Sequence, residues 1–157
     1  MPVRILSDKP QEYKDALIDW VFAHPHRFVI EDLAWALKTF GMGEQQCRDQ
    51  FRFAPKLGCI FVHDIPLYLF AVPPSGIVNT ASEARLERYG LPLTKDAIRF
   101  GKSPEGRQML AGSTGYIEQS DIANGSVRSR WLQAIGYRLT ETVEAYGQSF
   151  RKFDFQG

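Results

Sequence analysis

Two nearly continuous apolar runs in the middle of the chain constrain its fold more than any other feature. Residues 57–62 and 67–72 are rich in aliphatic, β-branched and aromatic side chains, and the link between them, residues 63–66, reads His-Asp-Ile-Pro. Short apolar runs joined by a turn-like link are typical of a β-hairpin. Because almost no polar residue interrupts either run, both strands are expected in the centre of a sheet, covered on both faces.

The elements around this hairpin alternate between strands and helices. Apolar residues at helical spacing predict helices over residues 10–24, 30–40, 94–111 and 126–135. Strands are expected over residues 2–7, 57–63, 66–72, 76–84, 115–122, 136–143 and 149–155. This order predicts one α/β domain over residues 1–157, with a mixed β-sheet of about six to seven strands flanked by helices on both faces.

A crossover is expected in the second half of the chain. The helical pattern over residues 94–111 lies between the strands expected over 76–84 and 115–122. A strand–helix–strand order in one sheet requires a crossover connection, which joins parallel strands. The two strands are therefore expected to be parallel neighbours.

Composition narrows the class of protein but not its chemistry. The chain has 157 residues, of which 44% are hydrophobic, and a net charge of +1 from 19 basic and 18 acidic residues. The apolar fraction excludes a disordered chain, and no apolar run approaches the roughly 18 residues of a membrane span. The balanced charge provides no global field for nucleic acid or for an anionic membrane. The two cysteines form no CxxC pair, so reduced thiols and a cytoplasmic location are expected.

Short motifs do not predict a phosphate or metal site. Residues 101–103, Gly-Lys-Ser, match the end of a phosphate-binding loop, but the glycine required five residues before the Gly-Lys pair is replaced by Asp96. His24 and His26 are close in sequence, but zinc needs three or four ligands on a rigid frame and none follows nearby. No metal is therefore expected.

A cluster of arginines suggests nucleic-acid binding only weakly. Arg128, Arg130 and Arg138 surround Trp131, and basic residues with an aromatic can clamp nucleic acid by charge and stacking. Trp131 shares a four-residue spacing with Ile135, however, so it is expected in the core of its helix. The arginines would then form the solvent-facing side of that helix, and nucleic acid is not an expected partner.

The C-terminal third, residues 115–157, is the most specific stretch of the sequence. A strand leads to Asn124, and the following helix ends in the step Ile135-Gly136-Tyr137 and leads into another strand. The chain then continues with Tyr-Gly and with Phe-Arg-Lys-Phe-Asp-Phe. This pattern resembles the second half of the GNAT superfamily of acyl-CoA-dependent N-acyltransferases. It is similar to small GNAT-like proteins of short-tailed bacteriophages, some described as acetyltransferases and others as internal virion proteins.

The resemblance implies a GNAT-like fold with acetyl-CoA between two parallel strands that diverge at one end. In that family, backbone N–H groups at a helix N-terminus hold the pyrophosphate of the cofactor. The matching amides here belong to Tyr89, Gly90 and Leu91, and Asn124 would lie near the pantetheine arm.

The sequence departs from the family at this cofactor loop. The family pattern is Gln/Arg-x-x-Gly-x-Gly/Ala, and the best register places Glu87, Gly90 and Pro92 on its three fixed positions. Only Gly90 fits, because Pro92 has no N–H to donate and Glu87 adds a negative charge near the phosphates. Weak or absent binding of acetyl-CoA is expected.

The resemblance also directs attention to three catalytic candidates. The family often uses a tyrosine on the last helix as general acid, but the matching position here is Leu132, so Tyr137 is the nearby candidate. The general base is often a glutamate on the fourth or fifth strand, and Glu83 and Glu118 are the candidates for this role.

Two functions from different classes remain open. The first is a phage-encoded N-acyltransferase of reduced or absent activity, which would act on an amine of a protein or of a small molecule. The second is a non-catalytic protein of the same fold that serves as a structural component of the virion or interacts with a host protein. The expected location is the host cytoplasm or the virion, without a membrane partner.

Overall fold

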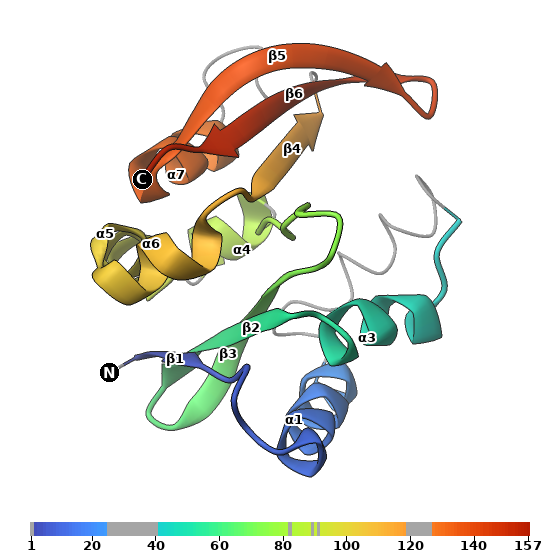
Figure 1. Ribbon diagram of the computed structural model, residues 1–157, viewed down its shortest axis with the longest axis vertical. Coiled ribbons are helices and arrows are strands. Elements are labelled where there is room, and N and C mark those ends of the chain that lie inside the picture. Colours follow the sequence, from blue (N-terminus) through green and yellow to red (C-terminus); the bar gives the residue numbers. More distant parts are fainter. Residues whose placement is uncertain (1, 25–40, 82, 89, 91, 119–126) are drawn as a thin grey trace. The chain divides into compact units, whose positions relative to one another are not determined.

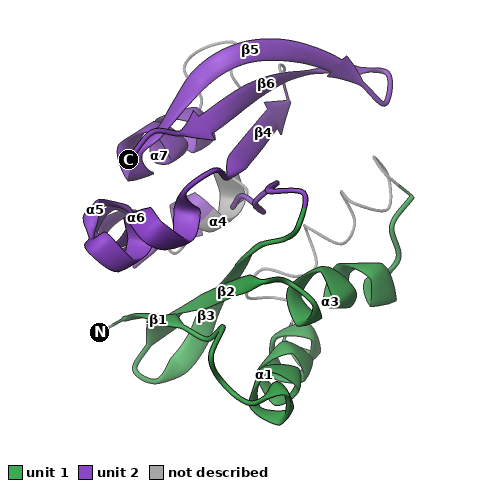
Figure 2. Cartoon of the chain, in the orientation of Figure 1, with its two compact units in different colours: residues 1–74 green, residues 75–157 purple. Residues whose placement is uncertain are grey.

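The computed structural model describes residues 2–24, 41–81, 83–88, 90, 92–118 and 127–157 (Figure 1). The chain divides into two compact units, residues 1–74 and 75–157 (Figure 2). The described residues form a mixed α+β structure with six α-helices and two three-stranded antiparallel sheets. The mixed α/β class is thus confirmed, whereas the described strands do not form the expected single sheet of six to seven strands. None of the described helices is long and apolar enough to cross a membrane.

The first unit is built on the predicted hairpin. β1 (Val3–Ile5), β2 (Lys56–Val62) and β3 (Ile65–Val72) pair antiparallel in the order β1-β2-β3, with α1 (Gln11–Ala23) and α3 (Glu44–Arg52) in the same unit. β2 is the central strand, and five consecutive residues of it are buried. The hairpin and the central position of β2 are confirmed, but β3 pairs on one side only.

Local geometry explains two features of the hairpin sequence. His63 and Asp64 form its two-residue turn with positive φ angles of 51° and 62°, the conformation that matches the twist of the paired strands. Within β2, a Cβ atom at Gly58 would lie 2.5 Å from Cζ of Phe70. Glycine is therefore required where the Phe70 ring crosses the neighbouring strand.

The helices of the first unit differ in part from expectation. α1 was expected to bury Tyr13, Ala16, Leu17, Trp20 and Val21, but its buried residues are Ile18, Val21 and Phe22. The apolar side of α1 is broad, and tertiary packing buries the part of it that carries Ile18, Val21 and Phe22. The helix expected over residues 30–40 lies outside the described residues.

The sequence did not predict α3, because this helix buries no residue and so has no apolar stripe. Instead, ion pairs connect it to α1: Arg48 contacts Asp19 at 2.5 Å and Arg52 contacts Asp15 at 3.2 Å.

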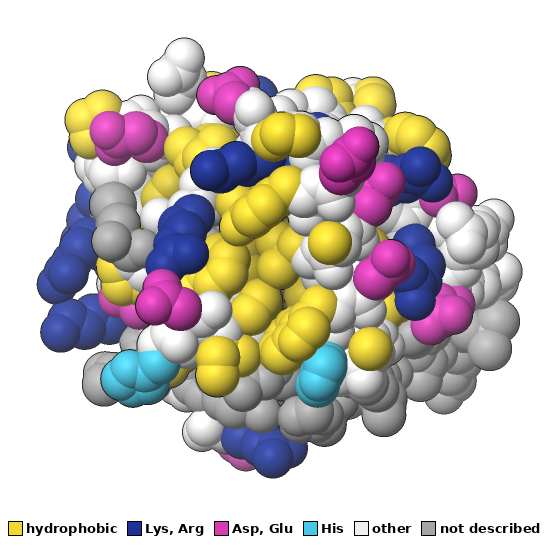
Figure 3. All heavy atoms as spheres, turned by 90° about the horizontal axis from the view of Figure 1, so that it is seen from below, with side chains coloured by type: hydrophobic (Ala, Val, Ile, Leu, Met, Phe, Trp, Pro, Cys, Tyr) yellow, Lys and Arg dark blue, Asp and Glu magenta, His cyan; other side chains and the backbone are white. Residues whose placement is uncertain are grey.

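Part of the first unit's hydrophobic surface is exposed. Ile5, Tyr13, Phe53 and Ile65 keep between 38% and 66% of their surface accessible. Hydrophobic side chains gather on the face of this unit that is seen from below, where charged side chains border them (Figure 3).

The second unit contains the C-terminal sheet and five of the helical segments. Its strands β4 (Thr114–Glu118), β5 (Tyr137–Ala145) and β6 (Gln148–Phe155) pair antiparallel in the order β4-β6-β5. Its helical segments are α4 (Glu83–Arg88), the π-helical turn η1 (Pro92–Asp96), α5 (Ala97–Lys102), α6 (Pro104–Leu110) and α7 (Val127–Ile135). The strands expected near 136–143 and 149–155 and the last helix are confirmed.

The core of this unit forms around α7. Trp131, Leu132 and Ile135 are buried, as the helical spacing predicted for Trp131 and Ile135. The indole Nε1 of Trp131 donates a hydrogen bond of 2.8 Å to the carbonyl of Leu93, which fastens η1 to α7. On β6, Phe153 is completely buried.

The helix expected over residues 94–111 is interrupted. α5 ends at Lys102 and α6 begins at Pro104. Proline is favourable in the first turn of a helix but cannot continue an earlier one. Ser103 caps α6, since its hydroxyl accepts a hydrogen bond of 3.0 Å from the Gly106 amide.

The prediction of a strand over residues 76–84 is wrong. Ile77 forms an isolated parallel bridge with Thr114, and the chain then turns into α4 at Glu83. A helix therefore begins where the expected strand would end. The parallel direction expected between this segment and β4 is confirmed for that one residue pair.

Hydrogen bonds to Asp154 on the C-terminal sheet make the stability of this fold depend on pH. Asp154 accepts hydrogen bonds from the hydroxyls of Thr114 (2.6 Å) and Thr140 (2.9 Å). The Thr114 bond, together with the weaker effects of Thr140 and of the charge of Lys152, holds the pKa of Asp154 below its ordinary value of 3.8, against a small opposing effect of burial. A carboxylate with a lowered folded-state pKa stabilises the fold above its unfolded value and loses this contribution as the pH falls through the folded value.

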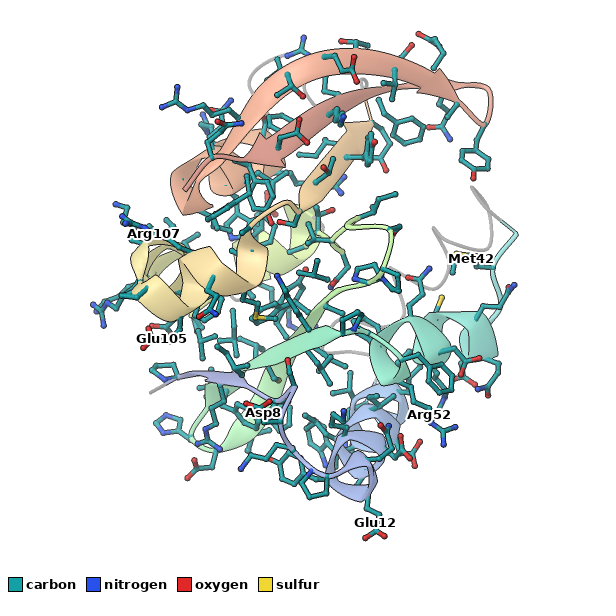
Figure 4. The ribbon with its side chains drawn as sticks, in the orientation of Figure 1. Asp8, Glu12, Met42, Arg52, Glu105 and Arg107 are labelled. Atoms are coloured by element: carbon teal, nitrogen blue, oxygen red, sulfur yellow. The ribbon has the colours of Figure 1, made fainter. Side chains whose placement is uncertain are left out.

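We expect Asp154→Asn to lower the free energy of unfolding at pH 7 by about 0.5–1 kcal/mol, a value kept small because solvent screens this half-exposed group. Urea unfolding of both proteins from pH 7 down to pH 2.5 should show the difference narrowing below pH 4. Asp8→Asn, at an exposed position (Figure 4), is the control and should leave stability unchanged. A difference that is constant with pH would contradict the role given to the carboxylate.

Candidate functional site

The segment between residues 76 and 81 runs beside β4 and is joined to it at one end. The Thr114 amide donates to the Gly76 carbonyl at 2.8 Å, and the Val78 amide donates to the Thr114 carbonyl at 2.9 Å. A Cβ atom at Gly115 would lie 3.6 Å from methyl groups of Val78 and Thr80, an ordinary van der Waals distance, so the segment still lies beside the strand at this residue. These contacts place two parallel stretches of backbone together at the start of β4.

Glu118, a predicted general base, lies at the other end of β4 in an ion pair. Its carboxylate Oε2 is 2.8 Å from Nη1 of Arg128 on α7, and the two side chains are 10% and 13% exposed. The same guanidinium donates from Nε to the Ala81 carbonyl at 3.0 Å and from Nη2 to the Thr80 hydroxyl at 2.8 Å. Arg128 thus connects α7, the segment before α4 and the end of β4.

This arrangement changes what Glu118 can do chemically. A general base needs a carboxylate oxygen within hydrogen-bond reach of the proton it abstracts. Oε2 of Glu118 instead accepts a hydrogen bond from Arg128, whose guanidinium donates two further hydrogen bonds, and the pair is largely withdrawn from water. The geometry is that of a structural ion pair with a balanced charge.

Tyr137, the predicted general acid, is buried at the start of β5 and is 3% exposed. Burial raises its pKa to about 12, with a smaller lowering effect from the hydrogen bond to Ser113. Ser113 gives its single hydroxyl hydrogen to the Leu110 carbonyl at 2.6 Å. The phenol of Tyr137 is therefore the donor in its 2.7 Å bond to Ser113 Oγ. Its proton is directed into the protein interior.

The structure does not bring the two groups together. Tyr137 pairs with Phe155 at one end of β6, whereas Glu118 pairs with Phe150, five residues away. At about 3.3 Å per residue this corresponds to a separation of about 17 Å along the sheet. Glu118 and Tyr137 therefore cannot act on the same reacting atoms.

The remaining predicted residues fall near α4 or outside the described residues. Glu83 is the first residue of α4 rather than a residue of a strand. The carbonyl of Gly90 accepts a hydrogen bond from the Thr94 hydroxyl. Tyr89, Leu91 and Asn124 lie outside the described residues, so their roles toward acetyl-CoA stay predictions.

The structure also shows where Glu87 and Pro92 lie, the two residues that differ from the family's cofactor-loop pattern. Glu87 is exposed on α4, and Pro92 opens the π-helical turn η1. The resemblance assigns this segment to a strand that runs directly into a helix. The structure instead has α4 before Gly90 and the π-helical turn η1 after it. This differs from the strand-to-helix turn whose free amides hold a pyrophosphate.

Sequence reasoning missed the role of Arg128. The three arginines were expected on the solvent-facing side, and Arg130 and Arg138 are exposed, but Arg128 is withdrawn into the ion pair. The signal was present in the helical spacing, because Arg128 precedes the buried Leu132 by four residues and so shares its side of α7.

Among the described residues, neither the Cys59 thiol nor a cluster of metal-ligating side chains forms a further reactive site. Burial raises the pKa of the Cys59 thiol to about 12, more than its backbone hydrogen bonds and the charge of Arg4 lower it, so the thiol stays protonated at neutral pH. Within the described ranges, no group of three or more His, Cys, Asp and Glu side chains could hold a metal ion.

The Arg128–Glu118 pair can be tested by a double-mutant cycle. Arg128→Met should lower the free energy of unfolding by about 3 kcal/mol, because it leaves the carboxylate buried without its cation. Adding Glu118→Leu should restore part of this loss, since an apolar pair removes the unpaired charge. Chemical denaturation of the four proteins should give a coupling energy above about 1 kcal/mol.

Arg130→Met serves as the control for this cycle. Arg130 is exposed on the same helix, and its replacement should change stability by less than about 0.5 kcal/mol. Additive effects of the two substitutions in the pair would show that the ion pair does not hold the segment.

No protein-family model, no curated protein and no solved structure matches this chain.

Proposed function

We propose that the chain is a GNAT-like protein in which acyl transfer from acetyl-CoA is reduced or absent, and which acts by binding another protein. The observation that carries this proposal is the Arg128–Glu118 pair. It neutralises the described candidate base at the end of β4, next to the segment where the family would bind its cofactor.

The GNAT-like frame is supported by the backbone around β4. Residues 76–78 pair with Thr114 in parallel at one point, and within the described residues no further backbone pairing with β4 follows before α4 begins at Glu83. A parallel contact between two such stretches of backbone is part of the arrangement in which the family holds acyl-CoA. The sequence pattern of residues 115–157 supports the same assignment, whereas the described strands form two three-stranded sheets and not one sheet of six to seven strands.

The loss of catalysis is supported by three independent placements. Glu118 is paired with Arg128, the proton of Tyr137 points to Ser113, and Glu83 stands on a helix. Pro92 lacks the amide that the family uses toward the pyrophosphate. A protein that keeps a frame but not its acid and base is better suited to binding than to turnover.

The biological setting of this proposal comes from the sequence resemblance. The similar proteins are encoded by short-tailed bacteriophages, so the partner proposed is a virion protein or a host protein. The protein would then function in the host cytoplasm or within the virion.

An active N-acyltransferase is the second candidate. Gly90 and the parallel bridge at Ile77 favour it, because both are features of an acyl-CoA site. Its acceptor would be an amine of a protein or of a small molecule.

Titration with acetyl-CoA separates the two candidates. We expect a Kd no tighter than about 1 mM, so that 1 mM acetyl-CoA stabilises the protein by no more than about 0.4 kcal/mol in a thermal-shift experiment. Chromatographic detection of free CoA in the presence of a mixture of amines should show no release above the buffer rate. A submicromolar Kd, or CoA release that depends on the protein, would establish the active transferase instead.

Two charge variants show whether any residual binding occurs at the predicted loop. Glu87→Gln removes the negative charge nearest to the expected pyrophosphate and should tighten residual binding by up to about tenfold. Glu105→Gln removes an exposed charge that points away from α6, and is the matched control (Figure 4). An equal response of both variants would place any bound acetyl-CoA away from the loop.

A further inference from the structure

A surface hollow of about 560 Å³ lies on η1 and α5 of the second unit. Its lining residues are Lys95, Ile98, Arg99, Lys102 and Ser103. Three of these five side chains are cations and none is an anion. We call this surface the basic hollow.

The three cations of the basic hollow are not neutralised within the described part of the chain. Lys95, Arg99 and Lys102 are exposed, and no described carboxylate lies within 4.0 Å of their charged nitrogen atoms. Figure 4 shows that the nearby Glu105 of α6 points away from its helix, and it does not line the hollow. The charge of this surface is therefore available to a partner.

The spacing of the cations indicates an extended anionic partner. Lys95, Arg99 and Lys102 are separated by four and three residues, so they follow one side of the helical segment. At 1.5 Å per residue their backbones span about 10 Å. Charge distributed over this length fits several carboxylates along a chain better than it fits one small anion.

The other two lining residues, Ile98 and Ser103, indicate which side chains a partner could present to the hollow. Ser103 has already used its hydroxyl, which donates to the Phe100 carbonyl at 2.7 Å and accepts from the Gly106 amide at 3.0 Å. Ile98 is half-buried and offers an aliphatic contact between the cations. The basic hollow thus combines three positive charges with one apolar contact.

This combination favours a protein segment over a nucleic acid. Single-stranded nucleic acid is held by aromatic side chains on which bases stack, and none of the lining residues is aromatic. An acidic peptide with an apolar side chain among its carboxylates matches both the charges and Ile98.

We propose that the basic hollow is the docking surface for an acidic segment of a partner protein. This inference rests on the binding role proposed above and names the surface and the partner chemistry for it. The carboxylates of the segment pair with Lys95, Arg99 and Lys102, and an aliphatic side chain of the segment contacts Ile98.

The test uses a fluorescein-labelled peptide of twelve residues, ten of them Asp or Glu and two of them Leu, measured by fluorescence anisotropy in low salt. We expect saturable binding to the full chain with a Kd below 1 mM. The variant Lys95→Gln/Arg99→Gln/Lys102→Gln should weaken this binding at least tenfold. Ile98→Ala should weaken it about threefold, and a peptide with Ser in place of Leu should lose the same factor.

The control variant is Lys9→Gln/Arg130→Gln/Arg138→Gln, in which three exposed cations outside the hollow are replaced. Both triple variants lower the formal net charge from +1 to −2. Equal weakening in both would show that binding depends on net charge alone and would overturn the proposal. All variants change exposed or half-buried side chains, and their thermal unfolding is measured first to establish that they fold.

Two further outcomes overturn the docking surface. One is the absence of peptide binding up to 1 mM, and the other is tighter binding of a twelve-nucleotide single-stranded DNA than of the peptide. Failure of the broader function is recognised differently, because protein-dependent release of CoA from acetyl-CoA would refute the binding role whether or not the peptide binds.

Discussion

The hydrogen bonds of the Arg128 guanidinium are the interactions on which the second unit depends most. The guanidinium contacts the Glu118 carboxylate on β4 and, on a second stretch of the chain, the Thr80 hydroxyl and the Ala81 carbonyl. Arginine suits this position because its planar fork presents several donors in fixed directions. Burial makes each contact stronger than it would be in water, and also makes the loss of one partner expensive.

The same interaction limits the chemistry available at the end of β4. The Glu118 carboxylate is held in place by a guanidinium that also donates hydrogen bonds to a hydroxyl and to a carbonyl. Tyr137 belongs to a second, separate hydrogen-bonded chain through Ser113 to Leu110. Both polar groups thus stabilise the fold where the GNAT resemblance would assign them to proton transfer.

Elements with strong local patterns were predictable from the sequence. The hairpin of β2 and β3 and the burial of Trp131 and Ile135 on α7 follow from apolar residues at strand and helix spacing. α3 was not predictable, since it buries no residue and its contacts to α1, which include two ion pairs, join residues far apart in sequence. For the candidate site, the GNAT resemblance suggested Glu118 and Tyr137, but the sequence did not show which partners would hold them.

The sequence by itself determined where strands and helices form wherever one face of an element carries a regular apolar pattern. It also determined that Glu87 and Pro92 stand at positions where the GNAT family, by the resemblance, has other residues. Only the tertiary structure decided that residues 76–81 form a single bridge instead of a strand, and that Arg128 turns inward to Glu118. The physical reason is that local patterns record burial, whereas the pairing of charges and backbone edges depends on which distant segments the fold brings together.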